Sequence, residues 1–252
     1  MKRERANSIL FQSIGVMLII LVWLLASFFI NNDFILPTLG TTLNTLVEIL
    51  SSENFYISFA FTFLRTIISI VCALILGVLI GLLAGLFPKM YYLLNPLISI
   101  LRFIPAPCFI FLLFSLFVKM PDWAAILLSF LIIFPILYES VAKGVMNVDQ
   151  SIKMSLKLEG YYKFNSIFKV IFPQTFPFLA VGIINSLGLG IKSSIMSEII
   201  IGSSNLKGIG RLIYVYNSDG NFPALFSLII VIIFVFLIID ALSSSLLKKI
   251  KK

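Results

Sequence analysis

The sequence contains no histidine and only two cysteines, Cys72 and Cys108, among its 252 residues. Both cysteines lie within apolar stretches, which favours small buried side chains over thiol chemistry. Without histidine or a Cys-x-x-Cys pair, a zinc site or a thiol-redox site lacks its ligands. The chain also offers no pair of carboxylates that would suit general acid-base catalysis. We therefore expect no metal site and no catalytic residues in this chain.

Charged residues are also scarce: they make up 12% of the chain, whereas hydrophobic residues make up 60%. A soluble domain carries about a quarter charged residues, so the apolar excess here must face lipid. The net charge of +8 does not indicate nucleic-acid binding, because the basic residues lie in loops and tails between apolar runs. The sequence therefore predicts an integral membrane protein in contact with the lipid bilayer, with residues 1–252 as a single domain.

The apolar residues gather into runs long enough, or nearly so, to cross a bilayer. These runs are Ile9–Ile30, Tyr56–Phe87, Tyr91–Val118, Trp123–Tyr138, Gln174–Met196 and Phe222–Leu247. The first exceeds the core of a signal peptide and does not end in small residues, so we expect a retained helix over 9–30. The predicted fold class is all-α, with about six transmembrane helices and a core over 56–247.

Lysines and arginines are distributed unevenly among the segments between these runs. They are concentrated at both termini and in the segment 139–173, whereas the loop 31–55 has none. Basic residues mark cytoplasmic segments. We therefore expect a multi-pass protein of the cytoplasmic (inner) membrane with both termini in the cytoplasm.

The segment 139–173 is longer than a simple connector. Apolar residues recur within it at helical spacing, for example Ile152 and Leu156, and Asp149 stands where it can cap this helix. We expect a second short helix over 163–171, before the fifth crossing. Two interpretations fit: a helix that inserts into a groove of a soluble partner, and an amphipathic helix resting on lipid headgroups.

Part of this segment resembles the coupling loop of ABC importer permeases. Gly160, Val170 and Pro173 match the G-x9-I-x-L-P half of that motif, whereas Met154, Ser155 and Leu156 replace the E-A-A residues of its first half. Glu159, beside Gly160, is a candidate for an ion pair at the rim of the partner, or is simply solvated. The coupling residues that the resemblance implies are Met154, Ser155, Leu156, Glu159, Gly160, Val170 and Pro173.

Other segments resemble the same family in the same order, from Leu36 to Asp240. They are Leu36-Pro37, Thr62-Phe63-Leu64-Arg65, Leu101-Arg102-Phe103-Ile104-Pro105, Phe134-Pro135-Ile136, Val148-Asp149, Glu198, Gly208-Ile209-Gly210 and Asp240. Together they resemble the nitrate, sulfonate, taurine and bicarbonate branch of binding-protein-dependent permeases, which also includes importers of thiamine precursors and riboflavin.

The resemblance implies a type I ABC importer fold and a permease that works as a dimer, either a homodimer or a pair of related chains, with two ATPase subunits and an external substrate-binding protein. The chain has no G-x4-G-K-[ST] phosphate loop, so we expect no cofactor here and ATP with Mg²⁺ on the partner ATPase. The expected substrate is a small anionic solute such as a sulfonate, nitrate or taurine. Alternatives are a vitamin or thiamine precursor carried by the same machinery, and a stand-alone secondary transporter, although no repeated half is evident.

Four charged residues within or near the apolar runs are candidates for the translocation path, because a charged side chain in a membrane is energetically costly and usually has a functional role. Arg65 either snorkels to the outer interface or lines the path. Arg102 either satisfies carbonyls freed by the Pro105-Ala106-Pro107 break or lines the path.

Lys192 and Glu198 lie in the fifth apolar run or just after it. Lys192 follows Gly188-Leu189-Gly190, whose glycines permit close packing at a dimer axis, and it is a candidate for attracting an anionic substrate. Glu198 either contacts the external binding protein or braces the loop that leads to Gly208-Ile209-Gly210.

Overall fold

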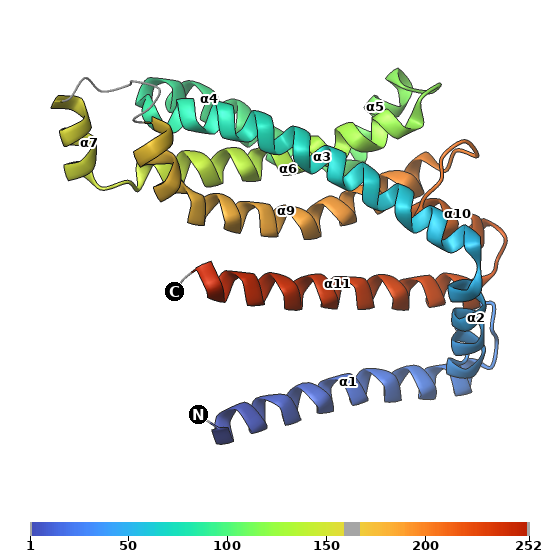
Figure 1. Cartoon of the computed structure of the whole chain (residues 1–252). Helices are drawn as coiled ribbons and strands as arrows, with labels where there is room; N and C mark the ends of the chain where they lie inside the picture. The colour runs from blue at the N-terminus through green and yellow to red at the C-terminus, as the bar shows by residue number, and fades with distance from the viewer. Residues whose placement is uncertain (1, 159–166, 251–252) are drawn as a thin grey trace. The chain divides into compact units, whose positions relative to one another are not determined.

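The computed structural model describes residues 2–158 and 167–250, and every regular element in these ranges is a helix (Figure 1). The elements in chain order are α1 (Lys2–Ile30), α2 (Leu39–Ser51), α3 (Glu53–Leu86), α4 (Pro88–Phe103), α5 (Ala106–Leu116), α6 (Pro121–Met146), α7 (Gln150–Leu158), a π-helical segment (Ile167–Ile171), α9 (Phe172–Ile201), α10 (Ile209–Ser218) and α11 (Phe222–Ile250). The all-α prediction is therefore confirmed.

The helices α1, α3, α6, α9 and α11 are each long and apolar enough to cross a membrane, which makes five candidate spans in the described residues. A sixth arises if α4 and α5, which meet at an angle of 92°, form one broken span. Pro105 caps α5 and Pro107 lies in its first turn, and proline cannot continue the hydrogen bonding of a preceding helix. The prediction of about six transmembrane helices is confirmed, and the break falls at the predicted proline pair.

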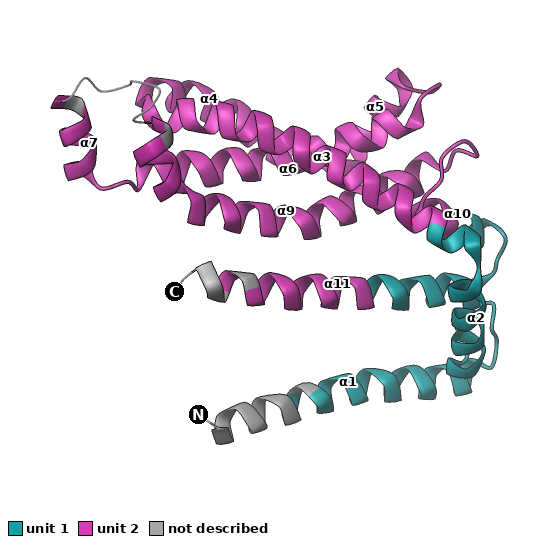
Figure 2. Cartoon of the chain, viewed as in Figure 1, with its two compact units in different colours: residues 1–56, 213–233 teal, residues 57–212, 234–252 magenta. Residues whose placement is uncertain are grey.

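The chain forms two compact units (Figure 2). Unit 1 comprises residues 1–56 and 213–233, and unit 2 comprises residues 57–212 and 234–252. Within unit 1, the Trp23 indole N–H donates to the Pro37 carbonyl at 3.0 Å, and its ring lies 5.7 Å from that of Phe226. The Ser227 hydroxyl donates to the Thr42 carbonyl at 2.7 Å. These contacts join α1, the α1–α2 loop, α2 and the first part of α11.

Unit 2 is built on close contact between the α3 and α6 backbones. Gly77, Gly81 and Gly85 lie four residues apart on α3 and form one stripe facing α6. A Cβ added at Gly85 would lie 2.5 Å from Cβ of Val145, which leaves no room for any side chain. In lipid, small residues allow the backbone approach that drives helix packing.

Glycines also allow close contact between α6 and α9. A Cβ at Gly144 would lie 2.6 Å from Thr175 Cγ2, and one at Gly182 would lie 2.6 Å from Ser140 Oγ. Around these contacts, α6 buries a continuous apolar surface that includes Ile133, Leu137 and Val141, with neighbours on α3 and α9. The α3–α6–α9 core is therefore held at fixed spacing and carries the functional residues described below.

Candidate functional site

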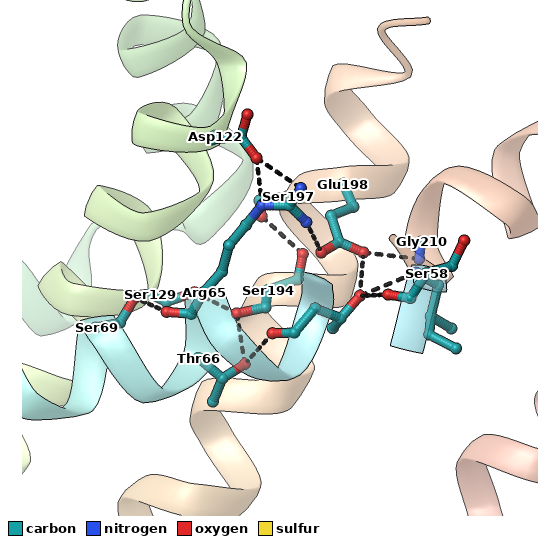
Figure 3. A network of polar contacts seen from close by, with 12 residues as sticks. Ser58, Arg65, Thr66, Ser69, Asp122, Ser129, Ser194, Ser197, Glu198 and Gly210 are labelled. Carbon is teal, nitrogen blue, oxygen red and sulfur yellow. Dashed lines mark hydrogen bonds and ion pairs between the residues drawn. The ribbon is translucent and has the colours of Figure 1, made fainter. Parts of the chain in front are cut away.

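A buried ionic network joins α3, α6 and α9 (Figure 3). Arg65 on α3 is 3% exposed, and its guanidinium lies between two carboxylates. Nη1 donates to Oε1 of Glu198 at 2.6 Å, and Nε donates to Oδ1 of Asp122 at 2.7 Å. Glu198 is fully buried, whereas the side chain of Asp122 is 48% exposed. The arginine charge is thus neutralised within the chain rather than left facing an open path.

The second carboxylate oxygen of Glu198 binds the N-terminus of α10. Oε2 accepts hydrogen bonds from the Gly210 backbone N–H and from the Thr62 hydroxyl, each at 2.9 Å. The Thr62 oxygen in turn accepts from the Ile209 backbone N–H at 2.9 Å. The first amide groups of a helix have no partner within that helix, so a carboxylate and a hydroxyl here take the place of a local cap.

Glycine is required where this loop meets Glu198. A Cβ added at Gly208 would overlap the Glu198 carboxylate, and one added at Gly210 would overlap the carbonyl oxygen of Ile195. Both overlaps involve groups that cannot move, since the carboxylate is held by Arg65 and the carbonyl belongs to the α9 backbone. The Gly208-Ile209-Gly210 segment therefore fits closely over α9.

Hydroxyl groups continue the network toward the middle of the helices. Ser194 on α9 accepts from the Thr66 hydroxyl at 2.9 Å and lies 3.0 Å from the hydroxyl oxygen of Ser129 on α6. Ser193 donates to Ser129 at 3.0 Å. All four side chains are buried, so their hydroxyl groups find partners across helices where lipid would offer none.

Arg102 forms a second charged cluster, at the end of α6 that leads to α7. Its guanidinium forms an ion pair with Glu139, whose other oxygen lies 2.6 Å from Nζ of Lys143. Nη2 of Arg102 also donates to the Pro135 carbonyl at 2.9 Å. A cavity of about 860 Å³ borders this cluster and has apolar walls that include Phe178.

Lys192 lines a different cavity, of about 570 Å³, between α9 and α11. Its side chain is exposed, and Nζ lies 5.2 Å from the ring centroid of Phe236, an arrangement typical of a cation–π contact. Among the described residues, no carboxylate forms an ion pair with Lys192. Gly188, one turn earlier on α9, has no atom near the position of a Cβ, so the groove is open there.

The helix α7 divides its apolar residues between two faces. Leu156 is buried and Ile152 is partly buried, and both belong to the core cluster of unit 2. Met154 and Leu158, also four residues apart, are 69% and 86% exposed. The backbone N–H of Ser151 donates to the Asp149 carboxylate at 2.9 Å; this capping bond holds the pKa of that carboxyl below its usual value. The predicted helix and its cap are confirmed.

Residues 73–252 match the family described as the inner membrane component of binding-protein-dependent transport systems. The chain belongs to this family. This permease is therefore the membrane-spanning subunit of a binding-protein-dependent ABC importer, a multi-pass protein of the inner membrane. Its family works with an ATPase subunit and a substrate-binding protein, and ATP hydrolysis resides on the separate ATPase.

Solved structures share the fold of the permease. One is an inward-facing MetNI methionine ABC transporter, with a TM-score of 0.61 and 17% identity, over 78% of this chain and 94% of that chain. Another is an amino acid ABC transporter with histidines, with a TM-score of 0.63 and 16% identity, over 81% and 97% of the two chains. No curated protein sequence matches the chain. The neighbours confirm the predicted type I importer fold.

The predicted path residues of the permease have different surroundings. Arg65 neither snorkels nor faces open space, because Asp122 and Glu198 enclose it. Arg102 meets the Pro135 carbonyl on α6, not a carbonyl at the proline break, because its side chain crosses to the neighbouring helix. Glu198 braces the loop to α10, which is one of the two contacts predicted for it. Only Lys192 lines a cavity without an ion pair among the described residues.

The predicted coupling residues of the permease are described only in part. Met154, Ser155 and Leu156 lie on α7, and Pro173 lies in the first turn of α9, as predicted. Val170 lies in the π-helical segment Ile167–Ile171, part of the predicted second helix. Glu159, Gly160 and residues 163–166 of that helix lie outside the described residues.

Sequence reasoning missed the partners of Arg65. A signal for part of the network existed, since Ser58, Thr62 and Thr66 recur every four residues beside Arg65 on α3. Such a polar stripe in an apolar helix predicts a buried polar contact. Asp122 gave no signal, because it lies in the first turn of α6, where a carboxylate is unremarkable in sequence.

Proposed function

We propose that this permease imports a small solute that carries an anionic group, as in the sulfonate, nitrate, taurine and bicarbonate branch, and that Lys192 attracts this group. The observation that carries the proposal is an exposed lysine beside a cavity of about 570 Å³, without an ion pair among the described residues. A cation in a membrane protein is costly to place, and one that forms no ion pair in the described part of its chain is available to a solute.

The other cations in the helical core support the choice of Lys192 by contrast. Arg65 contacts two carboxylates and is buried, so a passing anion would have to compete with both. Arg102 shares Glu139 with Lys143 and also holds a backbone carbonyl. These arginines stabilise the helix arrangement, and an anion gains less from a charge that is already paired.

Coupling to ATP hydrolysis passes through α7 in this proposal. Leu156 anchors the helix to the unit 2 core, while Met154 and Leu158 present an exposed apolar pair. An amphipathic helix with anchors at this spacing suits a groove on a soluble ATPase. ATP and Mg²⁺ bind to the ATPase, and movement of its groove is transmitted through α7 to the core as a rigid-body displacement.

The working assembly contains two copies of this permease, two ATPase subunits and an external binding protein. Both termini and α7 lie on the cytoplasmic side, in line with the concentration of basic residues in those segments. In this orientation, α10 and the network around Glu198 lie toward the binding protein, and α7 lies toward the ATPase.

Solute uptake by a Lys192→Met variant tests the role of Lys192. The variant keeps most of the side-chain volume and removes the charge, so the initial uptake rate of labelled taurine by cells with the complete importer should fall at least about tenfold. Lys119→Met removes one charge from an exposed position between α5 and α6 and serves as the matched control. Equal uptake by both variants and the parent would remove Lys192 from the path.

A further inference from the structure

The groove that contains Lys192 also contains a carboxylate. Asp240 on α11 lines the same cavity of about 570 Å³, together with the amide of Asn185 and the hydroxyl of Ser243. Lys192 lies over the ring of Phe236. Asp240 follows Phe236 by four residues, which places Phe236 and Asp240 on one face of α11. Among the described residues, Lys192 and Asp240 do not form an ion pair with each other.

A groove that served a plain anion would gain nothing from this carboxylate. Asp240 repels an anion bound at Lys192, and a negative charge beside lipid is costly unless a cation meets it. The two formal charges sum to zero, so the groove as a whole does not favour a charged solute. It favours a solute whose own charges are opposite and separated.

We infer that the solute is a small zwitterion, with its acidic group at Lys192 and its ammonium group at Asp240. The inference rests on the proposed function, because it assumes that Lys192 faces the path. It adds a second, cation-binding residue and restricts the substrate class to amino-sulfonates and amino acids of short chain. Asn185 and Ser243 supply further hydrogen-bonding groups of the kind that orient a small polar ligand.

Lys192 and Asp240 line one cavity, so a single small solute can reach both charges. Four residues along α11 correspond to a rise of about 6 Å, so Asp240 lies about one helical turn from the ring that Lys192 covers. The open position at Gly188 leaves space for the part of such a solute that joins its two charged groups.

The cluster around Arg102 does not offer the same chemistry, although its cavity is larger. Its charges already contact one another, since Glu139 pairs with both Arg102 and Lys143. A zwitterion would have to separate these pairs before it gained contacts of its own. The groove at Lys192 and Asp240 requires no such separation.

Matched ligands test the inference on the importer purified with its ATPase subunits. Taurine and ethanesulfonate differ only in the ammonium group, as do β-alanine and propionate, and binding is measured by isothermal titration calorimetry. For at least one pair, the zwitterion should bind at least about tenfold more tightly than its anion. Equal binding within each pair, or no binding of either zwitterion, would overturn the inference.

Two single variants separate this inference from the proposed function. Asp240→Asn should abolish the preference, with weaker zwitterion binding and unchanged or tighter anion binding, whereas Lys192→Gln should weaken both ligands of a pair. If Lys192→Gln weakens binding and Asp240→Asn leaves the preference intact, the inference of a zwitterionic solute is wrong, and the proposed role of Lys192 in attracting an anionic group is retained. If Lys192→Gln changes neither ligand's binding, the proposed function itself is wrong.

A double variant distinguishes solute binding from mutual neutralisation of two structural charges. Lys192→Gln with Asp240→Asn keeps the net charge, so thermal unfolding should stay near that of the parent while zwitterion binding is lost. If the double variant retains the parent's affinity and preference, the two residues only compensate each other and the inference fails. Asp219→Asn, in the exposed turn before α11, controls for loss of a carboxylate elsewhere.

Discussion

The charged residues on the two faces of α9 have opposite surroundings. On one face, Glu198 is fully buried and each of its oxygens accepts hydrogen bonds from α3 or α10. On the other face, Lys192 lies exposed beside a cavity, one turn from an open glycine, Gly188. A charge that its own chain compensates holds helices together, and a charge that the chain leaves open is available to a solute. We call the face that carries Glu198 the closed face of α9 and the face that carries Lys192 the open face. Position within the membrane span alone does not distinguish the two kinds of charge.

The largest effect should follow from breaking the closed face. Glu198→Ala leaves Arg65 with only the half-exposed Asp122, and it leaves the Gly210 N–H without an acceptor. Removing one partner of a buried ion pair costs about 3–5 kcal/mol, so we expect a loss of this order in the free energy of unfolding. Denaturant unfolding in mixed micelles measures it.

Asp122→Asn is the matched control for this prediction. It alters the exposed partner of the same arginine, where solvent screens the charge, and should cost about 1 kcal/mol or less. Losses of equal size from Glu198→Ala and Asp122→Asn would show that burial does not decide the strength of this network.

A smaller loss should follow from crowding the core that supports the closed face. Gly85→Ala places a methyl group 2.5 Å from Cβ of Val145, which is fixed to the α6 backbone. Overpacking of this kind costs about 1–3 kcal/mol in the free energy of unfolding. Gly188→Ala adds the same group where no atom lies within 4 Å, and the two variants are compared by thermal unfolding. Comparable destabilisation by both would contradict the assignment of closed and open faces.

The smallest effect on stability should follow from changes on the outer face of α7. Leu158→Ser replaces a side chain that is 86% exposed, so the free energy of unfolding should change by no more than about 0.5 kcal/mol. Stimulation of the ATPase by the solute-loaded binding protein should nevertheless fall, because the apolar anchor is lost. Leu156→Ser, on the buried face, should lower stability as well. Full ATPase stimulation in Leu158→Ser would exclude this face from coupling.

The membrane spans could be predicted because their signal is local: a run of apolar residues long enough to cross lipid. The prediction Trp123–Tyr138 was too short for α6, which continues to Met146. Its last turns combine buried apolar residues, such as Val141 and Val145, with charged ones, and the Glu139–Lys143 pair at i and i+4 supports the helix there. The sequence does not predict the helices α2 and α10, because each lies in a segment too short to span the membrane.

The candidate site could be predicted only as single residues. Lys192 and Glu198 stand out in sequence because charge is rare in apolar runs. Their different roles depend on partners far away in the chain: Arg65 lies 133 residues from Glu198, and Phe236 is on another helix. Local sequence patterns do not show which distant groups come into contact. The same signal, a charge in an apolar run, therefore marks both Glu198, which is paired, and Lys192, which forms no ion pair among the described residues.

Photo-cross-linking from cysteines on α7, each carrying a thiol-directed photoactivatable reagent, to the co-purifying ATPase tests the central claim, that an exposed face of α7 couples this permease to ATP hydrolysis. Cysteines replace Met154, Leu158 or Ile152 one at a time, after Cys72 and Cys108 are changed to alanine. The account predicts cross-links from 154 and 158, which are exposed, and none from 152, which packs on the core. No cross-link from 154 or 158 in a working importer, or labelling of these positions from outside the cell, would contradict it.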